Sequence, residues 1–517
     1  MTLAEYLRES GQSLATFAAE IGVSEAAMSR YAAGKRVPRK QILQRIVAAT
    51  GGKVQPNDLL GADAPAPADA LGWLEAHPEI ESVDLILSDL NGILRGKRVP
   101  RDVIVKVIDG GVRLAGSVYS LDSTGENTAG TGLVWSVGDK DQPVIPATGL
   151  IHPSTWTRPP TAQMLMSMRD DDGGPFWAEP RTVLANVTER VRALGVTPVI
   201  ALELEFYLID PERDAAGRPQ PPISPVSGRR DTATQVYGLE ALDQFGKVLG
   251  EITDACAAQN VPADAAVAEY APGQYEVNLH HVPDPMSACD HALLLKRTVK
   301  GVATANGLEA TFMARPYAEH AGSGLHAHLS LVDEQGRNLF DGGGADGPAM
   351  VSDTLRHAVG GLCETMAEAM AIFAPNGNSY RRLRPGSYAP LSPAWGIDNR
   401  TVALRIPGGP GGARRIEHRV AGADANLYLT VAAILAGLHH GITNQIEPPE
   451  PMTGNAYDQL EPSLPTRWPD ALDLFDRSAV LRDYLGDRFC GLFATCKRGE
   501  LAKFEAHISD LEHAWYL

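Results

Sequence analysis

Cysteine is scarce in this chain, and long apolar runs are missing. The 517 residues contain five cysteines, an odd number with no Cys-x-x-Cys pair, which argues against a disulfide framework and a zinc site. We expect free, buried thiols at all five positions: Cys256, Cys289, Cys363, Cys490 and Cys496. No stretch approaches the roughly 18 consecutive apolar residues of a membrane helix, and the N-terminus lacks a signal-peptide core. The sequence therefore predicts a cytoplasmic protein without a membrane partner.

Positive charge is also in short supply. The formal net charge is −17 and the sequence pI is about 5.3, which argues against a general nucleic-acid binder. There is no P-loop, no Gly-x-Gly-x-x-Gly after an expected strand, and no nucleophile elbow. If the protein handles phosphate, metal ions and arginine side chains must do the work.

The most informative stretch of the chain is residues 201–208, Ala-Leu-Glu-Leu-Glu-Phe-Tyr-Leu. Apolar and acidic residues alternate here, which predicts a β-strand whose two faces differ. Glu203 and Glu205 share one face, and Leu202, Leu204 and Phe206 share the other. Two carboxylates side by side repel each other unless a cation or another partner neutralises them.

Three later segments repeat this alternation of polar and apolar residues. Each predicts a strand with one charged or polar face: Glu276, Asn278 and His280 with Glu269 across a Pro-Gly turn; His326, His328 and Ser330; and Arg415, Glu417 and Arg419.

If the four strands are neighbours in one antiparallel sheet, one face carries several carboxylates and an imidazole. Oxygen-rich clusters of this kind suit Mg²⁺ or Mn²⁺. The alternative is that these are ordinary solvent-facing residues, because antiparallel sheets often have one wet face. The recurrence of the pattern in four segments favours a metal site built from Glu203, Glu205, Glu269, Glu276, His326 and Glu417.

Arginines concentrate in the later part of the chain, around a Gly-rich loop at residues 408–412. They include Arg381, Arg382, Arg400, Arg405, Arg414, Arg415 and Arg419. Guanidinium groups bind carboxylates and phosphates in bidentate fashion, so arginines beside a metal site suit an ATP-dependent reaction on an acid. Ion pairing with surface acids is the alternative explanation for some of them.

Residues 1–60 differ from the rest in charge, with a balance of +3 against −20 for residues 61–517. Ser13 and Ser24 are placed to cap helices at 14–21 and 25–33, with Gly22 in the turn and a further helix after Pro38. This spacing resembles a Cro/repressor-type helix-turn-helix domain. The residues that would face DNA are Ser29, Arg30, Lys35 and Arg36. The alternative is a small helical bundle that serves packing or protein contacts.

The remaining chain is predicted to be α+β. Residues 61–70 are rich in Ala and Pro and predict a linker. Asn91-Gly92 lies between two alternating runs and predicts a hairpin with positive φ at both residues. We expect a small domain at 71–174 and a larger one at 175–517, in which the charged strands alternate with helices. Those helices are expected at 181–194, 239–259, 286–306, 353–374 and 427–441.

Six ordered motifs resemble the glutamine synthetase family. They are Glu-x-Glu-Phe, Glu-Tyr-x-Pro-Gly-Gln-Tyr-Glu, Gly-Ser-Gly-x-His-x-His, Asn-Ser-Tyr-Arg-Arg, Asn-Arg-x-x-x-x-Arg-Ile-Pro and Arg-Arg-Ile-Glu-x-Arg, and the resemblance covers about residues 70–517. It implies a β-grasp domain followed by a catalytic domain with an antiparallel active-site sheet. It also implies a homo-oligomer of two stacked six-membered rings, a dodecamer, with active sites between subunits.

The resemblance also implies roles for individual residues. Two Mg²⁺ or Mn²⁺ ions would be held by Glu205, Glu269 and Glu276 and by Glu203, His326 and Glu417. Glutamate would be bound by Gly322, Arg382 and Arg419, and ATP by His328, Ser330, Arg400, Arg405 and Arg415. The implied reaction forms γ-glutamyl phosphate from glutamate and ATP, and an amine then displaces phosphate to give an amide.

Two departures from true glutamine synthetases bear on the amine. Those enzymes place a glutamate over the ammonium where this chain has Tyr388, and an asparagine where it has Ala321. Both changes favour a larger amine, since an aromatic ring can meet an alkylammonium. The segments at 89–97, 319–324 and 420–426 resemble the γ-glutamylputrescine-forming branch, which predicts a glutamate–putrescine ligase of polyamine catabolism or nitrogen assimilation. Asp122 is a candidate base for the amine.

Two other functions stay open at this point. The amine is ethanolamine, a monoalkylamine or ammonia in one of them. In the other, the protein is a DNA-binding regulator whose ligase fold senses polyamine or glutamate. The complete set of metal-site residues argues against a pure sensor.

Overall fold

The structure is a computed structural model that describes residues 3–32, 40–50, 53–54, 70–230, 232, 236–344 and 350–517. It contains two compact units, residues 1–76 and residues 77–517.

The first unit is helical, with helices α1 (Leu3–Ser10), α2 (Leu14–Ile21), α3 (Glu25–Ala32), α4 (Lys40–Ala49) and α5 (Ala70–Ala76). Ser13 caps α2, because its hydroxyl accepts from the Thr16 amide at 3.2 Å, and Gly22 ends it with φ +77°. Ser24 accepts from the Ala27 amide at 3.2 Å at the start of α3. Helices α2 and α3 and their two caps lie where the sequence predicts them, whereas α1 was not predicted.

The core of these helices contains Phe17, Ile21, Met28 and Ile46, all buried. Ser29 is exposed, while Lys35, Arg36 and the linker residues 61–69 lie outside the described residues, as does the side chain of Arg30. The helix-turn-helix class of this unit and its contact with DNA therefore stay predictions.

The second unit begins with a six-stranded mixed sheet in the order β2-β1-β6-β4-β3, with β5 also on β6. Its strands are β1 (Ser82–Ser88), β2 (Leu94–Pro100), β3 (Val112–Ala115), β4 (Asp141–Pro146), β5 (His152–Ser154) and β6 (Thr161–Met168). The sheet is mixed because β1 runs antiparallel to β2 and parallel to β6.

The β1–β2 hairpin is confirmed, but its turn differs from the expected one. Of Asn91 and Gly92 only Gly92 has a positive φ, +72°. The reason is Asp89, whose carboxylate accepts from the amides of Asn91 and Ile93, both at 2.9 Å, and so fixes a longer turn.

The second sheet has eight strands in the order β12-β13-β14-β11-β7-β9-β8, with β10 on the other part of β7. They are β7 (Thr197–Ile209), β8 (Ala263–Ala268), β9 (Gln274–Leu279), β10 (Glu309–Thr311), β11 (Leu325–Val332), β12 (Trp395–Ile397), β13 (Leu404–Ile406) and β14 (Ile416–His418). Only the β12–β13 pair is parallel. The four charged segments form β7, β9, β11 and β14, which are neighbours in one largely antiparallel sheet, as the sequence predicts.

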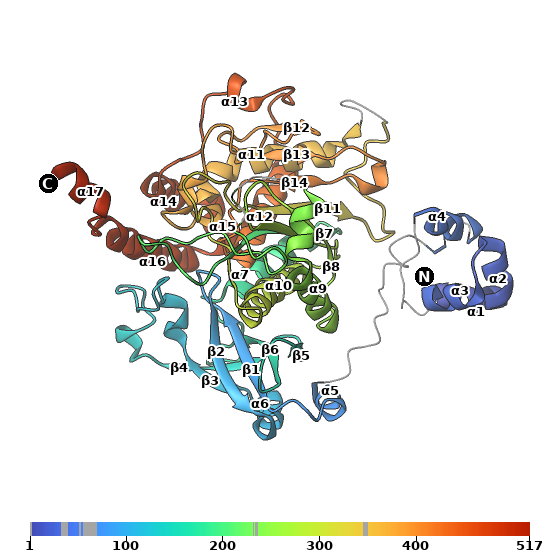
Figure 1. Cartoon of the computed structure of the whole chain (residues 1–517). Helices are drawn as coiled ribbons and strands as arrows, with labels where there is room; N and C mark the ends of the chain where they lie inside the picture. The colour runs from blue at the N-terminus through green and yellow to red at the C-terminus, as the bar shows by residue number, and fades with distance from the viewer. Residues whose placement is uncertain are drawn as a thin grey trace. The chain divides into compact units, whose positions relative to one another are not determined.

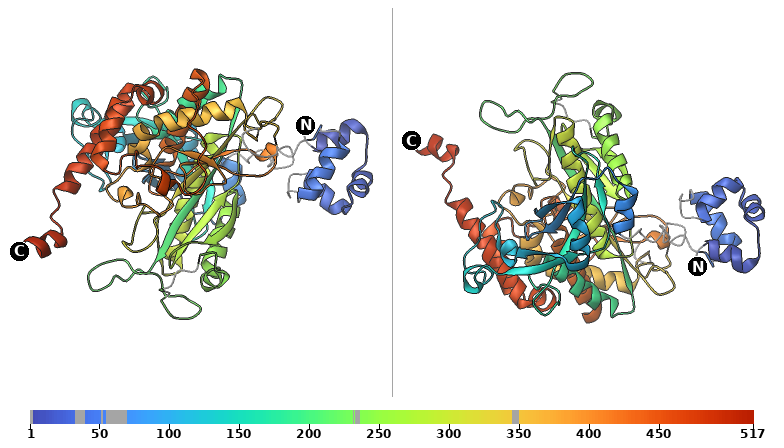
Figure 2. Two further views of the ribbon diagram at one scale, coloured as in Figure 1. Left: turned by 90° about the horizontal axis from the view of Figure 1, so that it is seen from above. Right: turned by 90° about the horizontal axis from the view of Figure 1, so that it is seen from below.

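The helices of this unit are α6 (Ile104–Gly110), α7 (Pro180–Arg192), α8 (Leu239–Gln244), α9 (Gly246–Ala258), α10 (Pro285–Ala305), α11 (Asp353–Phe373), α12 (Leu427–Asn444), α13 (Ala456–Gln459), α14 (Trp468–Arg477), α15 (Ala479–Leu485), α16 (Asp487–Glu505) and α17 (Asp510–Tyr516). Helix α9 contacts β8 of the larger sheet and β5 of the smaller one, while α10 packs on β7 (Figure 1). Helices α11 and α12 pack together, α16 packs on α14 and α15, and α17 extends outward at the C-terminus (Figure 2).

One expected helix, at 239–259, is two helices in the structure. The chain leaves helical geometry at Phe245, with φ −121° and ψ 17°, between α8 and α9. Phe245 is buried against the ring of Tyr275, with centroids 6.1 Å apart, so packing overrides the local helical pattern.

The five cysteines are free thiols, and four of them are buried. Within the described ranges, no helix combines the length and apolar character that crossing a membrane requires.

Candidate active site

Strand register brings the predicted site residues together on one face of the larger sheet. The pairs that lie directly opposite each other are Glu203 and His326, Glu205 and Glu276, and His328 and Glu417. Opposite residues on antiparallel strands have Cβ atoms only about 5 Å apart, so these carboxylates and imidazoles are neighbours.

The other face of the sheet explains why the charges point the way they do. Leu202, Leu204 and Phe206 are at most 1% exposed, and α10 packs on this strand. A one-residue slip would bury Glu203 and Glu205 under the helix, so the buried apolar set fixes the register.

The charged face forms one wall of a cavity of about 790 Å³. Its lining holds predicted site residues and several that the sequence analysis did not single out. The first group is Glu203, Glu205, Glu269, Glu276, Gly322, His326, His328, Tyr388, Arg400, Arg405, Arg415, Glu417 and Arg419. The second includes Tyr237, Tyr270, Arg315, Glu319 and Arg384.

Two groups of side chains in this cavity have the geometry of metal sites. Glu203, Glu276 and His326 place one ligand atom each within 4.8 Å of one another, and so do Glu203, His328 and Glu417. Glu203 joins the two groups: its carboxylate lies 3.2 Å from His326 Nδ1 and 2.7 Å from His328 Nε2. Carboxylate oxygens with a single imidazole in each group fit a hard divalent ion.

The grouping differs in detail from the one that the sequence suggests. His328, which the resemblance assigns to the nucleotide, lies in the second group, where its Nδ1 accepts from Arg415 Nε at 3.0 Å. Glu205 instead accepts from the amide of Gly324 at 2.8 Å and the side chain of Gln274 at 3.3 Å. Metal ligation stays a prediction for all six residues, and Glu205 and Glu269 belong to neither of the two groups.

Glu417 already has cationic partners. Arg405 Nη1 donates to its Oε2 at 2.7 Å, and Arg419 Nη1 donates to its Oε1. Burial acts to raise the pKa of Glu417, but the charges of His326 and Arg419 outweigh it and lower the pKa to about 2. Similarly, hydrogen bonds from His326 and His328 overcome burial and lower the pKa of Glu203.

Two other carboxyl groups shift in the opposite direction. Burial and then the charges of Glu203, Glu205 and Glu269 raise the pKa of Glu276 to about 9. Burial and then Glu205 raise the pKa of Glu269 to about 7. These two side chains therefore hold protons in the metal-free protein that a bound divalent cation would displace.

This arrangement predicts how stability depends on pH. In the folded protein the pKa values of Glu269 and Glu276, about 7 and about 9, lie above the ordinary value of 4.5. Their contribution to the free energy of unfolding is therefore complete below pH 4.5 and is lost as pH rises through about 7 and about 9. Where the folded state binds one proton more than the unfolded state, the free energy of unfolding falls by up to about 1.4 kcal/mol for each unit of increase in pH. We expect chelator-treated protein to melt at a lower temperature at pH 9 than at pH 6, and excess Mn²⁺ to remove most of the difference.

The matched control is Glu276→Gln, whose side chain cannot titrate. Its melting temperature without metal should fall less steeply over the same pH range. An unchanged slope in this variant, measured by scanning calorimetry, would mean that the acidic surface and not the cavity governs the pH dependence.

Arginines occupy the side of the cavity beyond the carboxylates. Arg400 is exposed, with its Nη1 3.4 Å from the hydroxyl of Tyr237, and its charge acts to lower the pKa of Glu269. Arg405 bridges Glu417 and Asp398, at 2.7 and 2.9 Å. A guanidinium cluster next to a metal-ligand cluster is the arrangement that phosphoryl transfer requires.

Three tyrosines form an open aromatic rim at the cavity. Tyr237, Tyr270 and Tyr388 are 57%, 41% and 45% exposed, and the rings of Tyr270 and Tyr388 lie 5.7 Å apart. Tyr388 has a φ of +56°, a left-handed conformation that costs about 1–2 kcal/mol for a bulky residue. The loop holds the ring over the cavity at that cost. Tyr270 belongs to the Glu-Tyr-x-Pro-Gly-Gln-Tyr-Glu motif, so the sequence could have indicated it as a site residue. Tyr237 lies in no recognisable pattern, so no signal in the sequence indicates it.

Three predicted site residues do not line the cavity: Asp122, Arg382 and Ser330. The carboxylate of Asp122 accepts hydrogen bonds from Lys503 Nζ and from the backbone amides of Thr124 and Glu126. Burial acts to raise its pKa, but these hydrogen bonds lower it to about 2. A carboxylate with so low a pKa is a poor proton acceptor, so Asp122 does not suit the role of base. Arg382 is 5% exposed and donates to the Val420 carbonyl at 2.8 Å. It packs behind Gly322, where a Cβ atom would lie 2.7 Å from its Cγ.

The fold and the cavity together are those of a ligase that activates an acid with ATP. Residues 177–516 match the family model "Glutamine synthetase, catalytic domain". The chain belongs to the glutamine synthetase family and is an ATP-dependent carbon–nitrogen ligase.

Among its relatives is the γ-glutamylputrescine synthetase PuuA of Escherichia coli K12, which is 44% identical over 446 residues, 86% of this chain and 93% of the relative. A glutamate–isopropylamine ligase of a Pseudomonas species is 31% identical over 86% of this chain and 96% of its own length. A solved structure, the GmaS/ADP complex in its conformation 1, superposes with a TM-score of 0.75 at 29% identity, covering 87% of this chain and 99% of the other.

Proposed function

We propose that the protein joins the γ-carboxyl group of glutamate to one amino group of putrescine, with ATP as co-substrate. The observation that carries the proposal is a single cavity in which two carboxylate–imidazole groups, an arginine wall and a tyrosine rim meet. The 44% identity to a γ-glutamylputrescine synthetase over most of both chains supports the amine.

The two metal groups would hold two Mg²⁺ or Mn²⁺ ions, which offset negative charge on the transferring phosphoryl group when bound. Arg400, Arg405 and Arg415 face the same space and would bind phosphate oxygens, while Gly322 and Arg419 would contact glutamate. Arg382 would act indirectly, as a positioning residue, because it packs behind Gly322 and donates a hydrogen bond to the carbonyl of Val420.

The reaction proceeds in two displacements. A γ-carboxylate oxygen of glutamate attacks the γ-phosphorus of ATP, and ADP leaves. The free amine then attacks the acyl carbon, the carbon–oxygen bond breaks, and phosphate leaves with one oxygen of the carboxylate. The nitrogen loses a proton to give the amide.

An isotope experiment tests this sequence. The enzyme is incubated with Mg²⁺, ATP, putrescine and glutamate labelled with ¹⁸O in its γ-carboxyl group. We expect γ-glutamylputrescine, and one ¹⁸O atom in the phosphate released, both seen by mass spectrometry. Unlabelled phosphate would exclude the acyl-phosphate route.

The aromatic rim predicts amine selectivity. A ring face over an alkylammonium contributes about 0.5–2 kcal/mol, so Tyr388→Glu should raise the KM for putrescine about 2- to 30-fold. The new carboxylate should at the same time improve the use of ammonium. Tyr388→Phe keeps the ring and should retain putrescine, which separates the ring from the hydroxyl; equal KM values for putrescine in all three proteins would exclude a role for the rim.

The family resemblance also leads us to propose a homo-oligomer of stacked six-membered rings.

For the first unit we propose DNA binding, supported by the capped α2–Gly22–α3 arrangement and the exposed Ser29. Several copies in one oligomer would gain avidity. A gel-shift titration with the protein's own promoter DNA should show binding that weakens with salt; no shift at low salt would contradict this.

A further inference from the structure

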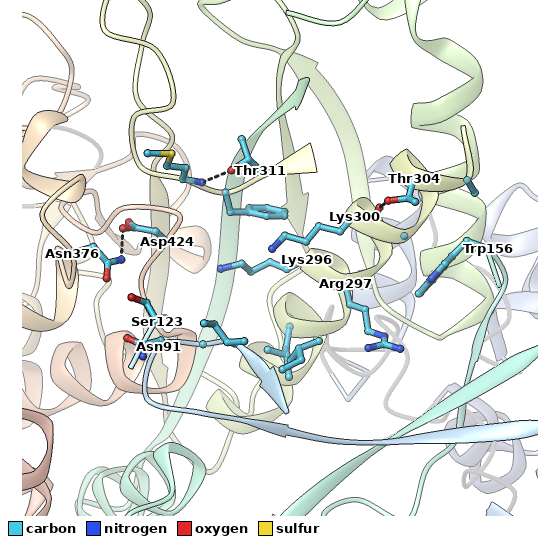
Figure 3. A pocket seen from close by; sticks show the side chains of 18 residues that line it. Asn91, Ser123, Trp156, Lys296, Arg297, Lys300, Thr304, Thr311, Asn376 and Asp424 are labelled. Carbon is cyan, nitrogen blue, oxygen red and sulfur yellow. Dashed lines mark hydrogen bonds between the residues drawn. The ribbon is translucent and has the colours of Figure 1, made fainter. Parts of the chain in front are cut away.

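A second cavity, of about 710 Å³, lies between the β1–β2 hairpin and helix α10 in the second unit (Figure 3). It shares no lining residue with the active-site cavity. Its walls come from the hairpin turn, one face of α10, the chain after β10, and two loops that contribute Asn376 and Asp424. The catalytic machinery described above makes no use of it.

The face of α10 that meets this cavity carries two lysines one helical turn apart. Lys296 and Lys300 extend from the helix into the cavity, towards the wall that holds Asp424 and Asn376 (Figure 3). Lys296 Nζ donates to the carbonyl of Ala423 at 2.8 Å and lies 5.1 Å from the centroid of the Phe312 ring. Among the described residues, the ammonium of Lys300 has neither a hydrogen bond nor an ion pair.

The surrounding acids do not balance these two charges. Asp424 Oδ2 accepts hydrogen bonds from Asn376 Nδ2 at 2.8 Å and from Ser379 Oγ at 2.6 Å. Its Oδ1 is buried and has no hydrogen-bond partner within the described residues, so neither lysine donates to it. The carboxylate of Asp84 pairs with Arg297, the third cation of this helix face. Burial and then the charge of Lys300 lower the pKa of Lys296 to about 8, against the opposing charge of Asp424, whereas Lys300 itself is exposed to solvent.

The rest of the lining is largely apolar. Leu94, Leu293, Phe312 and Met313 contribute side chains, and Trp156 lies flat against α10. Trp156 reaches this position only because residue 301 is glycine: a Cβ atom there would lie 2.2 Å from the indole nitrogen. The cavity therefore combines uncompensated positive charge with aromatic and aliphatic walls.

We propose that this cavity binds a small organic anion, whose carboxylate or phosphate group lies between Lys296 and Lys300 and whose apolar body packs against Phe312 and Met313. An oxyanion supplies the counter-charge that the lining lacks, and charge-assisted hydrogen bonds from two ammonium groups hold it. The proposal does not depend on which amine the active site uses.

Lysine labelling of the full-length protein tests the site directly. Reductive dimethylation followed by peptide mass spectrometry reports the reactivity of Lys296 and Lys300, and exposed Lys106 on α6 is the internal control. Three probes are compared at millimolar concentration: phenyl phosphate, inorganic phosphate and uncharged benzyl alcohol. We expect phenyl phosphate to protect Lys296 and Lys300, phosphate to protect them less, and benzyl alcohol not to protect them. Lys106 should react equally throughout.

Calorimetric titration with phenyl phosphate measures the affinity. Lys300→Gln should weaken binding about tenfold or more, since it removes a charge-assisted hydrogen bond, whereas Lys106→Gln should not. Three results would overturn the proposal. They are no protection by phenyl phosphate, equal protection by benzyl alcohol, and lysines that are unreactive in the ligand-free protein because another copy of the chain covers the cavity.

Discussion

Replacing Glu203 with glutamine is expected to lower ATP-dependent phosphate release by about 100-fold or more. Glu203 is the one carboxylate common to both candidate metal groups, and it contacts His326 and His328 at 3.2 and 2.7 Å. Losing even an outer partner of a metal ligand commonly costs 10- to 100-fold in metal affinity or activity, and loss of a shared ligand should cost at least as much. Steady-state kinetics over a range of Mn²⁺ concentrations measures the effect.

Glu309→Gln is the matched control for this variant. Glu309 lies on β10, which pairs with the same strand β7, but it forms a surface ion pair with Arg213 at 2.6 Å and does not line the cavity. Its activity should equal that of the unaltered protein. A Glu203→Gln enzyme that keeps its rate and its Mn²⁺ dependence would show that the two groups are not metal sites.

Arg400→Ala is expected to lower kcat by about 1000-fold. An arginine that stabilises the transferring phosphoryl group contributes about 10³–10⁵ in rate, and Arg400 is an exposed arginine of the cavity wall that has no carboxylate partner within the described residues. The KM for glutamate should change little, because the interaction is made mainly in the transition state. Rapid-quench measurement of a single turnover isolates this step.

The control is Arg381→Ala, which removes an exposed arginine from the motif next to the cavity without touching its lining. The rate should stay unchanged. If Arg400→Ala instead raised the KM for ATP with kcat intact, Arg400 would be a ground-state binding residue and not a catalytic one.

Local sequence patterns were sufficient to predict the strands of the active-site sheet. Alternation of polar and apolar residues is a property of each strand alone, and the buried apolar face, with Leu202, Leu204 and Phe206, settles which side the carboxylates take. The pairing that sets Glu205 opposite Glu276 required the assumption that the charged strands are neighbours, and the structure confirms it.

What the sequence could not supply depends on contacts between distant residues. His328 meets Glu203 because β11 lies beside β7, whereas the resemblance alone places it at the nucleotide. Asp122 is held by Lys503 from the far end of the chain. Tyr237 lies in an irregular loop with no periodic signal.

We propose that the cavity selects a diamine and not ammonium. The most direct measurement is phosphate release with Mg²⁺, ATP and glutamate, titrated in parallel with putrescine and with ammonium chloride. We expect saturation at a far lower concentration of putrescine, with γ-glutamylputrescine as the product. Saturation by ammonium at a concentration as low as that of putrescine, with glutamine as the product, would contradict the proposed selectivity and the assigned role of Tyr388.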